Sequence, residues 1–84
     1  MTPLITDENE FLIFTAKELM VSVSDISLDT DFRSIESWSS LTALIYVSSI
    51  NEETSVFISS ADLVELIKLK DVYNLILSRL HGTV

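Results

Sequence analysis

The chain has 84 residues, 48% of them hydrophobic, with no cysteine, one histidine and a formal net charge of -8. This length suits one small domain, and the apolar content excludes a disordered acidic tail, so we expect residues 1–84 to fold as a single domain. The negative charge disfavours nucleic acid and favours a protein partner with a basic patch, while the lack of cysteine excludes disulfides and thiolate metal sites.

A first helix is predicted from Asp7 to about Val21. Asp7 and Glu10 have the spacing of a capping box, and acidic residues suit the positive end of a helix dipole. Apolar residues then recur at helical spacing. They are Leu12, Ala16, Leu19, Met20 and Val23.

Residues 22–39 are rich in serine and show no sustained periodicity, which predicts a long loop. Because loops longer than about 12–15 residues are uncommon in compact domains, this one is expected either to be pinned to a core or to be mobile, and a short helical turn is compatible with it. Its apolar residues are Ile26, Leu28, Phe32, Ile35 and Trp38. The acidic residues Asp29, Asp31 and Glu36 lack the pattern of a calcium loop, so we interpret them as a solvated surface and expect no metal.

Residues 41–53 are locally ambiguous between strand and helix. We predict a helix because strict alternation fails, with Ser39 or Ser40 as the N-cap. Helical spacing places one set of residues on the core side, namely Leu41, Leu44, Val47 and Ile50. The outward face is then expected to contain Thr42, Ile45, Tyr46 and Ser49. The alternative is that Ile45 or Tyr46 turns inward, and for Ile45 that alternative is almost as well supported.

A short helix over residues 61–67, capped by Ser59 or Ser60, and a last helix from Leu69 complete the chain. The last helix carries one apolar stripe and is expected to stop at Gly82, with Arg79 and His81 near its negative end. The stripe consists of Leu69, Val72, Tyr73, Ile76 and Leu80. The predicted fold class is therefore all-α, a small four-helix bundle with three longer helices, one short helix and a long first loop.

The stretch from Leu19 to Val72 resembles an acyl carrier protein or peptidyl carrier domain. Trp38-Ser39-Ser40-Leu41 is similar to the Trp-Asp-Ser-Leu attachment motif of that family, and Leu28-Asp29-Thr30-Asp31-Phe32 resembles its first loop. Glu52-Glu53 resembles the acidic end of the second helix, and Val56-Phe57-Ile58 the link that follows. Met20 and Ser55 stand where glycines are common, at helix ends where positive φ costs other residues free energy.

The resemblance implies that Ser40 accepts 4'-phosphopantetheine from coenzyme A through a phosphopantetheinyl transferase. It implies a non-catalytic carrier that holds acyl or aminoacyl groups as thioesters in fatty acid, polyketide or related biosynthesis, with acyl-transferring or synthase enzymes as partners. Ser39 stands where the family usually has an Asp that helps the transferase and its metal. The alternative is an unmodified, carrier-like interaction module that has lost the arm.

Several residues near Ser40 have two interpretations. Trp38, Leu41, Ile58 and Leu63 either frame an apolar entry for the arm or cargo, or serve as ordinary core. Ser40 itself is either the attachment site or only an N-cap. A hydrolase would need a Ser–His pair, and the lone His81 lies near the chain end, so no catalytic residue is assigned.

The family's second helix is commonly the docking element, yet residues 40–50 carry no charge. We expect Ile45 and Tyr46 to form an apolar patch beside Ser40. The acidic loop at Asp29, Asp31 and Glu36 flanks this patch, and the loop together with Glu52 and Glu53 is expected to guide a partner. The N-terminal stretch has no secretion-signal pattern, and no apolar run approaches the roughly 20 residues of a membrane span. A cytoplasmic location is therefore expected. We also expect a monomer.

Overall fold

The computed structural model describes residues 7–80, and within them the regular structure is helical. The four α-helices are α1 (Glu8–Leu19), α2 (Ser40–Thr54), α3 (Ser60–Glu65) and α4 (Leu69–Leu80). Two short 3-10 helices, η1 (Val23–Asp25) and η2 (Phe32–Ser34), lie in the connection between α1 and α2. The predicted all-α bundle of three longer helices and one short helix is confirmed.

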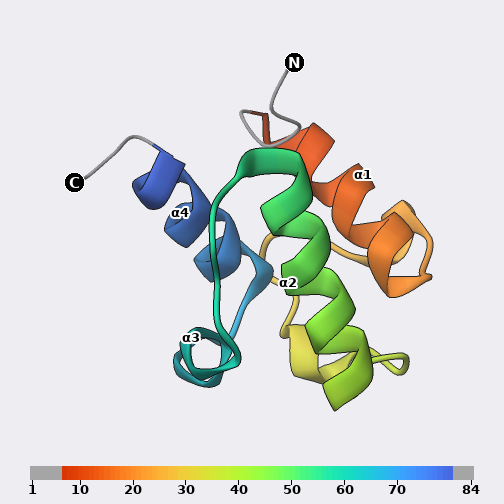
Figure 1. The fold of residues 1–84 in the computed structure, drawn as a ribbon. Coiled ribbons are helices and arrows are strands. Elements are labelled where there is room, and N and C mark those ends of the chain that lie inside the picture. The colour runs from red at the N-terminus through yellow and green to blue at the C-terminus, as the bar shows by residue number, and fades with distance from the viewer. Residues whose placement is uncertain (1–6, 81–84) are drawn as a thin grey trace.

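The three longer helices surround a common core, and α3 lies beside the N-terminal half of α2 (Figure 1). α1 and α2 run in opposite directions, and the long connection between them passes behind α2 (Figure 1). Each longer helix contributes at least one completely buried side chain to the core. These side chains include Phe11 and Leu19 from α1, Tyr46 and Ile50 from α2, and Leu69, Val72 and Ile76 from α4.

α1 begins as predicted, because the Asp7 carboxylate accepts a hydrogen bond from the Asn9 amide at 3.2 Å. It ends at Leu19, two residues before the predicted end. The reason is Met20, which adopts the left-handed conformation with φ of 61°. This geometry turns the chain out of the helix, and the Val21 amide then bonds back to the Ala16 carbonyl at 3.0 Å.

The long loop is pinned to the core. Phe32 is fully buried and Ile26 is buried, while Leu28, Ile35 and Trp38 pack against the core from partly exposed positions. Backbone hydrogen bonds also tie the loop to the segment before α4, since the Phe32 amide donates to Ile67 and the Leu69 amide donates to Thr30. The loop also contains the two short helical turns η1 and η2, which confirms that a helical turn is compatible with this segment.

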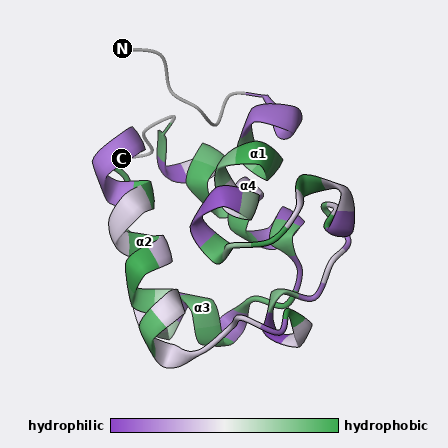
Figure 2. Ribbon diagram, turned by 90° about the vertical axis from the view of Figure 1, so that its right-hand side faces the viewer, coloured by the Kyte–Doolittle hydropathy of each residue, from purple (hydrophilic) through white to green (hydrophobic). Residues whose placement is uncertain are grey.

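The predicted faces of α2 are wrong in part. Tyr46 is fully buried, whereas Leu41 and Leu44 are 68% and 57% exposed. The cause is that the apolar residues of α2 are spread over several sides of the helix, interspersed with polar ones, so residue spacing alone does not single out the core side (Figure 2). Burying the largest ring decides the orientation, and the Tyr46 hydroxyl finds the buried Thr15 hydroxyl at 2.8 Å. Burial raises the pKa of Tyr46, so its hydroxyl stays neutral.

The segment after α2 contains a second correction. Ile58 is only 1% exposed and belongs to the core, while the neighbouring Phe57 is 70% exposed. The chain is extended here, so alternate side chains point to opposite sides, and Ile58 does not form part of a contact surface.

The last two helices follow the sequence pattern. α3 begins at Ser60 with Ser59 as its N-cap, and Ser59 and Asp62 form a capping box. α3 ends at Glu65, two residues before the predicted end, and α4 begins at Leu69 and buries the predicted stripe down to Ile76. The predicted stop at His81 and Gly82 lies outside the described residues.

Candidate functional site

The start of α2 is held in place by a chain of hydrogen bonds. Ser39 is the N-cap, and its hydroxyl accepts from the Thr42 amide at 3.1 Å. The Thr42 hydroxyl in turn donates to the Ser37 carbonyl at 2.9 Å, and the Ser37 hydroxyl donates to the Leu19 carbonyl at the end of α1. These bonds fix the first turn of α2 relative to α1.

Ser40 is the first residue of α2 and is exposed. Its hydroxyl makes no hydrogen bond with any of residues 7–80, in contrast to the Ser39 hydroxyl, which is engaged in the cap. The first turn of α2 contains no acidic residue that would offset its positive dipole end. Ser40 therefore presents a free hydroxyl at a position that favours a negative group.

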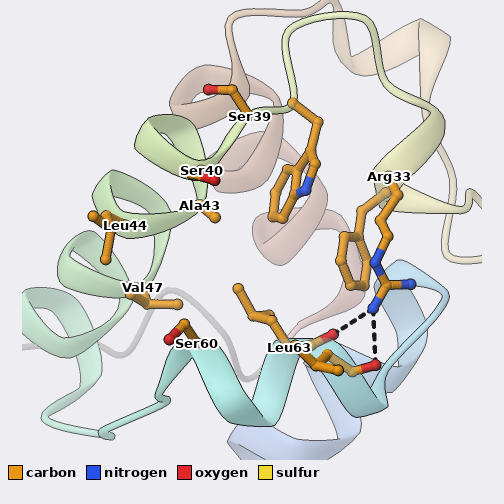
Figure 3. Close-up of a pocket in the computed structure, with 11 residues that line it drawn as sticks. Arg33, Ser39, Ser40, Ala43, Leu44, Val47, Ser60 and Leu63 are labelled. Atoms are coloured by element: carbon orange, nitrogen blue, oxygen red, sulfur yellow. Dashed lines mark hydrogen bonds between the residues drawn. The ribbon is translucent and has the colours of Figure 1, made fainter.

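A pocket of about 450 Å³ opens between α2 and α3 beside Ser40. Ser40, Ala43 and Val47 face it from α2, and Leu63 points toward it from α3 (Figure 3). The lining is mostly apolar, with a few hydroxyl groups and one cation. It consists of Phe32, Arg33, Trp38, Ser39, Ser40, Ala43, Leu44, Val47, Ser60, Leu63 and Val64.

Trp38 combines its two predicted roles. Its ring packs 4.9 Å from the ring of Phe32 and 6.3 Å from that of Tyr46, centroid to centroid, so it braces the loop against the core. It also lines the pocket beside Ser40. Core packing and a place in the pocket wall are thus compatible for this residue.

Arg33 lines the pocket on the side opposite α2 (Figure 3). Its Nη2 donates to the carbonyls of Leu63 and Val64, near the end of α3, at 2.7 and 3.0 Å (Figure 3). Its guanidinium carbon also lies 5.1 Å from the centroid of the Phe32 ring. Among the described residues Arg33 makes no ion pair with a carboxylate.

The other end of α3 is held by Arg79 of α4. Its Nη1 donates to Asp62 at 2.9 Å and to the Phe57 carbonyl at 2.8 Å. The hydrogen bond from Arg79, together with that from the Ser59 amide, lowers the pKa of Asp62 to about 2. The carboxylate is therefore ionised at neutral pH.

The predicted site residues divide into three groups in space. Trp38, Ser39 and Ser40 meet at the pocket. Leu41 and Ile45 lie on the exposed surface of α2 and do not line the pocket, while Tyr46 and Ile58 are core. Glu52 and Glu53 lie about 18 Å along α2 from Ser40, given a rise of about 1.5 Å per residue, so they border a different region.

Sequence reasoning missed much of the pocket wall. Ala43, Leu44 and Val47 follow Ser40 by three, four and seven residues, so helical spacing was the available signal for them. Arg33 is the only basic residue between Lys17 and Lys68, a weaker signal. Whether Val64 lines the pocket depends on where α3 packs, and the order of residues in the sequence does not reveal that.

Two acidic residues of the loop, Asp29 and Asp31, have structural partners. Asp31 accepts from the Arg33 amide at 2.9 Å as the cap of η2, and Asp29 lies 3.7 Å from the ammonium of Lys70. Within residues 7–80 no three acidic, histidine or cysteine side chains gather in a metal-binding arrangement. In the same part of the chain no helix has the length and hydropathy to cross a membrane.

Comparison with known proteins identifies the family. A family model described as a phosphopantetheine attachment site matches residues 13–76, which include the start of α2 and the whole pocket. Neither the curated proteins nor the solved structures contain a significant match. Since the family model covers more than half of the chain, this protein belongs to the phosphopantetheine attachment site family, whose members covalently bind 4'-phosphopantetheine.

Proposed function

We propose that this chain is an acyl carrier protein that bears 4'-phosphopantetheine on Ser40. The observation that carries the proposal is the exposed Ser40 hydroxyl, which has no hydrogen-bond partner among the described residues and lies beside the pocket. When bound, the arm supplies a terminal thiol, a group that the cysteine-free chain lacks. The chain then holds acyl or aminoacyl groups as thioesters for fatty acid, polyketide or related biosynthesis.

The surroundings of Ser40 fit a phosphodiester. The amides at the start of α2 precede the helix's own hydrogen-bond ladder, and the dipole of this 15-residue helix is positive there. A phosphate at Ser40 meets no carboxylate in the first turn of the helix. Ser39 is less suitable because its hydroxyl is already bonded to the Thr42 amide.

The pocket offers an apolar surface within reach of the same residue. Trp38, Val47 and Leu63 supply its walls, so an aliphatic part of the arm or its cargo would lose water contact there. No residue is assigned a catalytic role, and the only histidine, His81, lies outside the described residues. The mostly apolar lining of the pocket suits holding an aliphatic group.

The partners in this proposal are a phosphopantetheinyl transferase and acyl-transferring or synthase enzymes. Three exposed apolar residues on α2, Leu41, Leu44 and Ile45, form what we call the α2 apolar face. It replaces the patch of Ile45 and Tyr46 that the sequence predicted. Glu52 and Glu53 at the far end of α2 contribute to the negative field that steers a basic partner.

The competing function is an unmodified interaction module. Ser39 favours it, because a serine caps α2 without supplying the carboxylate that the family usually places next to the attachment serine. Such a module would keep the fold and the α2 apolar face and would never gain mass from coenzyme A.

Incubation with coenzyme A and a broad-specificity transferase, followed by intact-mass measurement, separates the two functions. The native chain should gain one arm, and Ser40→Ala should gain none while remaining folded, because the Ser40 hydroxyl bonds to none of the described residues and alanine is a strong helix former. Ser48→Ala, at an exposed serine of the same helix, is the matched control and should be modified normally. No gain of mass by the native chain would support the unmodified module.

A further inference from the structure

α3 is held by polar contacts more than by burial. It is six residues long, too short to persist without tertiary support. Leu63 is its only buried residue, and Val64 on the same helix is 74% exposed. Contacts from outside the helix must therefore keep it in place.

Two arginines from different elements provide those contacts, one at each end. Arg79 of α4 bonds to Asp62 near the start of α3 and to the Phe57 carbonyl just before it. Arg33 of the long loop bonds to the carbonyls of Leu63 and Val64 near the end. A cation is favourable at this end of the helix, where carbonyl groups lack partners within the helix.

Arg33 is the contact that concerns the pocket. Arg33, Leu63 and Val64 all line it, so the two hydrogen bonds join residues of facing walls. The guanidinium is also held against the buried Phe32 ring, whose backbone amide bonds to the Ile67 carbonyl. This arrangement orients the arginine before it reaches α3.

We propose that Arg33 is a positioning residue that clamps the end of α3 to the long loop and thereby sets the width of the pocket beside Ser40. Without the clamp, the end of α3 keeps the packing of Leu63 and Leu66 and the backbone hydrogen bond from the Phe32 amide to the Ile67 carbonyl just beyond it. The turn at Leu63 and Val64 then moves away from Trp38 and α2. The pocket, which is already open to solvent at Ser40, Leu44 and Val64, then widens. The role of the pocket in holding cargo rests on the proposed function, whereas the clamp itself does not.

The clamp can be tested on the unmodified protein with Arg33→Met. Methionine keeps an apolar stem over Phe32 but has no donor, so it removes the hydrogen bonds without uncovering the ring. Arg33→Lys keeps the charge but lacks the planar guanidinium. Lys70→Met is the matched control, because it removes one exposed cation that pairs with Asp29 outside the pocket.

Amide hydrogen exchange reports on the helix, and acrylamide quenching of Trp38, the only tryptophan, reports on the pocket. In both Arg33 variants the amides of Leu63 and Leu66, which bond to Ser59 and Leu63, should exchange about tenfold faster, as expected for the loss of charge-assisted hydrogen bonds. Exchange in the middle of α1 and α4 should not change, and Trp38 should be quenched more strongly. Lys70→Met should match the native chain in both measurements.

Three outcomes would overturn the clamp. Unchanged exchange in α3 would show that Arg33 does not hold it, and equal acceleration in all helices would mean that Arg33 acts only on global stability. Faster α3 exchange without stronger quenching of Trp38 would show that Arg33 holds α3 but does not set the width of the pocket. None of these measurements needs the arm, so failure of the clamp is distinct from failure of Ser40 to gain mass.

Discussion

Ser39 and Ser40 are neighbours in the chain with different environments. Ser39 has extended backbone angles, φ of -158° and ψ of 172°, and its hydroxyl bonds to the Thr42 amide. Asp and Ser are equally good residues for that cap, so the change from the family's Asp alters the charge and leaves the cap intact. Ser40 begins the helix with an exposed hydroxyl.

Restoring the carboxylate should therefore affect recognition more than stability. Ser39→Asp should be modified faster by the transferase, while the free energy of unfolding should change by less than about 1 kcal/mol. The initial rate of mass gain and a urea midpoint check the two parts. Ser48→Asp adds the same charge elsewhere on α2 and should not be faster. Equal rates for Ser39→Asp and the native chain would mean that this transferase does not use the position.

Positive φ was foreseeable at two residues. Met20 and Ser55 stand where the resembling family often has glycine, and both are left-handed, with φ of 61° and 63°. Glycine at these positions in the family indicates a positive φ. Met and Ser do not indicate it, because neither residue favours the left-handed conformation. The two helix ends keep their turn geometry despite the substitutions.

At the scale of elements, the buried face of a helix could be predicted only where its apolar residues lie on one side. α4 has a single apolar stripe and charged residues elsewhere, and its buried residues were predicted. The apolar residues of α2 are not confined to one side, so its inward face was not predicted, although its bounds were predicted to within about one residue. Which side is buried depends on Tyr46 meeting Thr15 of α1, a contact between residues 31 positions apart.

α3 should respond to acid through Asp62. Its pKa in the folded protein is about 2, below the ordinary 3.8, so the folded state favours the ionised form. The resulting stabilisation is complete above the ordinary value and is lost as the pH falls toward 2. Asp62→Asn lacks this group, so its stability deficit relative to the native chain should shrink over that range.

Urea unfolding at a series of pH values measures that deficit. Glu65→Gln, which removes an exposed carboxylate from the same helix, controls for the loss of one negative charge. A deficit of Asp62→Asn that stays constant from neutral pH down to about 2 would contradict the pairing with Arg79.

The α2 apolar face should act mainly on dissociation. Leu41→Ala should speed release from the transferase several-fold, because interface truncations mostly change the dissociation rate. Leu41 is 68% exposed, so folding should be little affected. Ile67→Ala truncates an exposed apolar residue outside α2 and should bind normally. Binding that tolerates Leu41→Ala and Ile45→Ala but fails when Glu52 and Glu53 are neutralised would indicate mainly electrostatic docking.

At the scale of the whole molecule, the site is built from residues that are consecutive in the sequence and from residues that only packing brings together. Trp38-Ser39-Ser40-Leu41 located the start of α2 from four consecutive residues. The facing wall comes from Leu63 and Val64, and their position depends on the arginines that hold α3. A pattern in consecutive residues can reveal an attachment point, but the pocket beside it emerges only when the chain packs.

The net charge of -8 also acts at this scale, and both Arg33 and Arg79 have internal roles on α3. The field favours a basic partner surface, and salt should weaken that attraction.

The central claim is that Ser40, and not Ser39, carries the arm. Fragmentation mass spectrometry of the tryptic peptide that spans residues 34–68, after incubation with coenzyme A and transferase, tests it most directly. We predict that every fragment containing Ser40 has the added mass and that fragments ending at Ser39 do not. Added mass on fragments that end at Ser39, or a chain that never gains mass, would contradict the account.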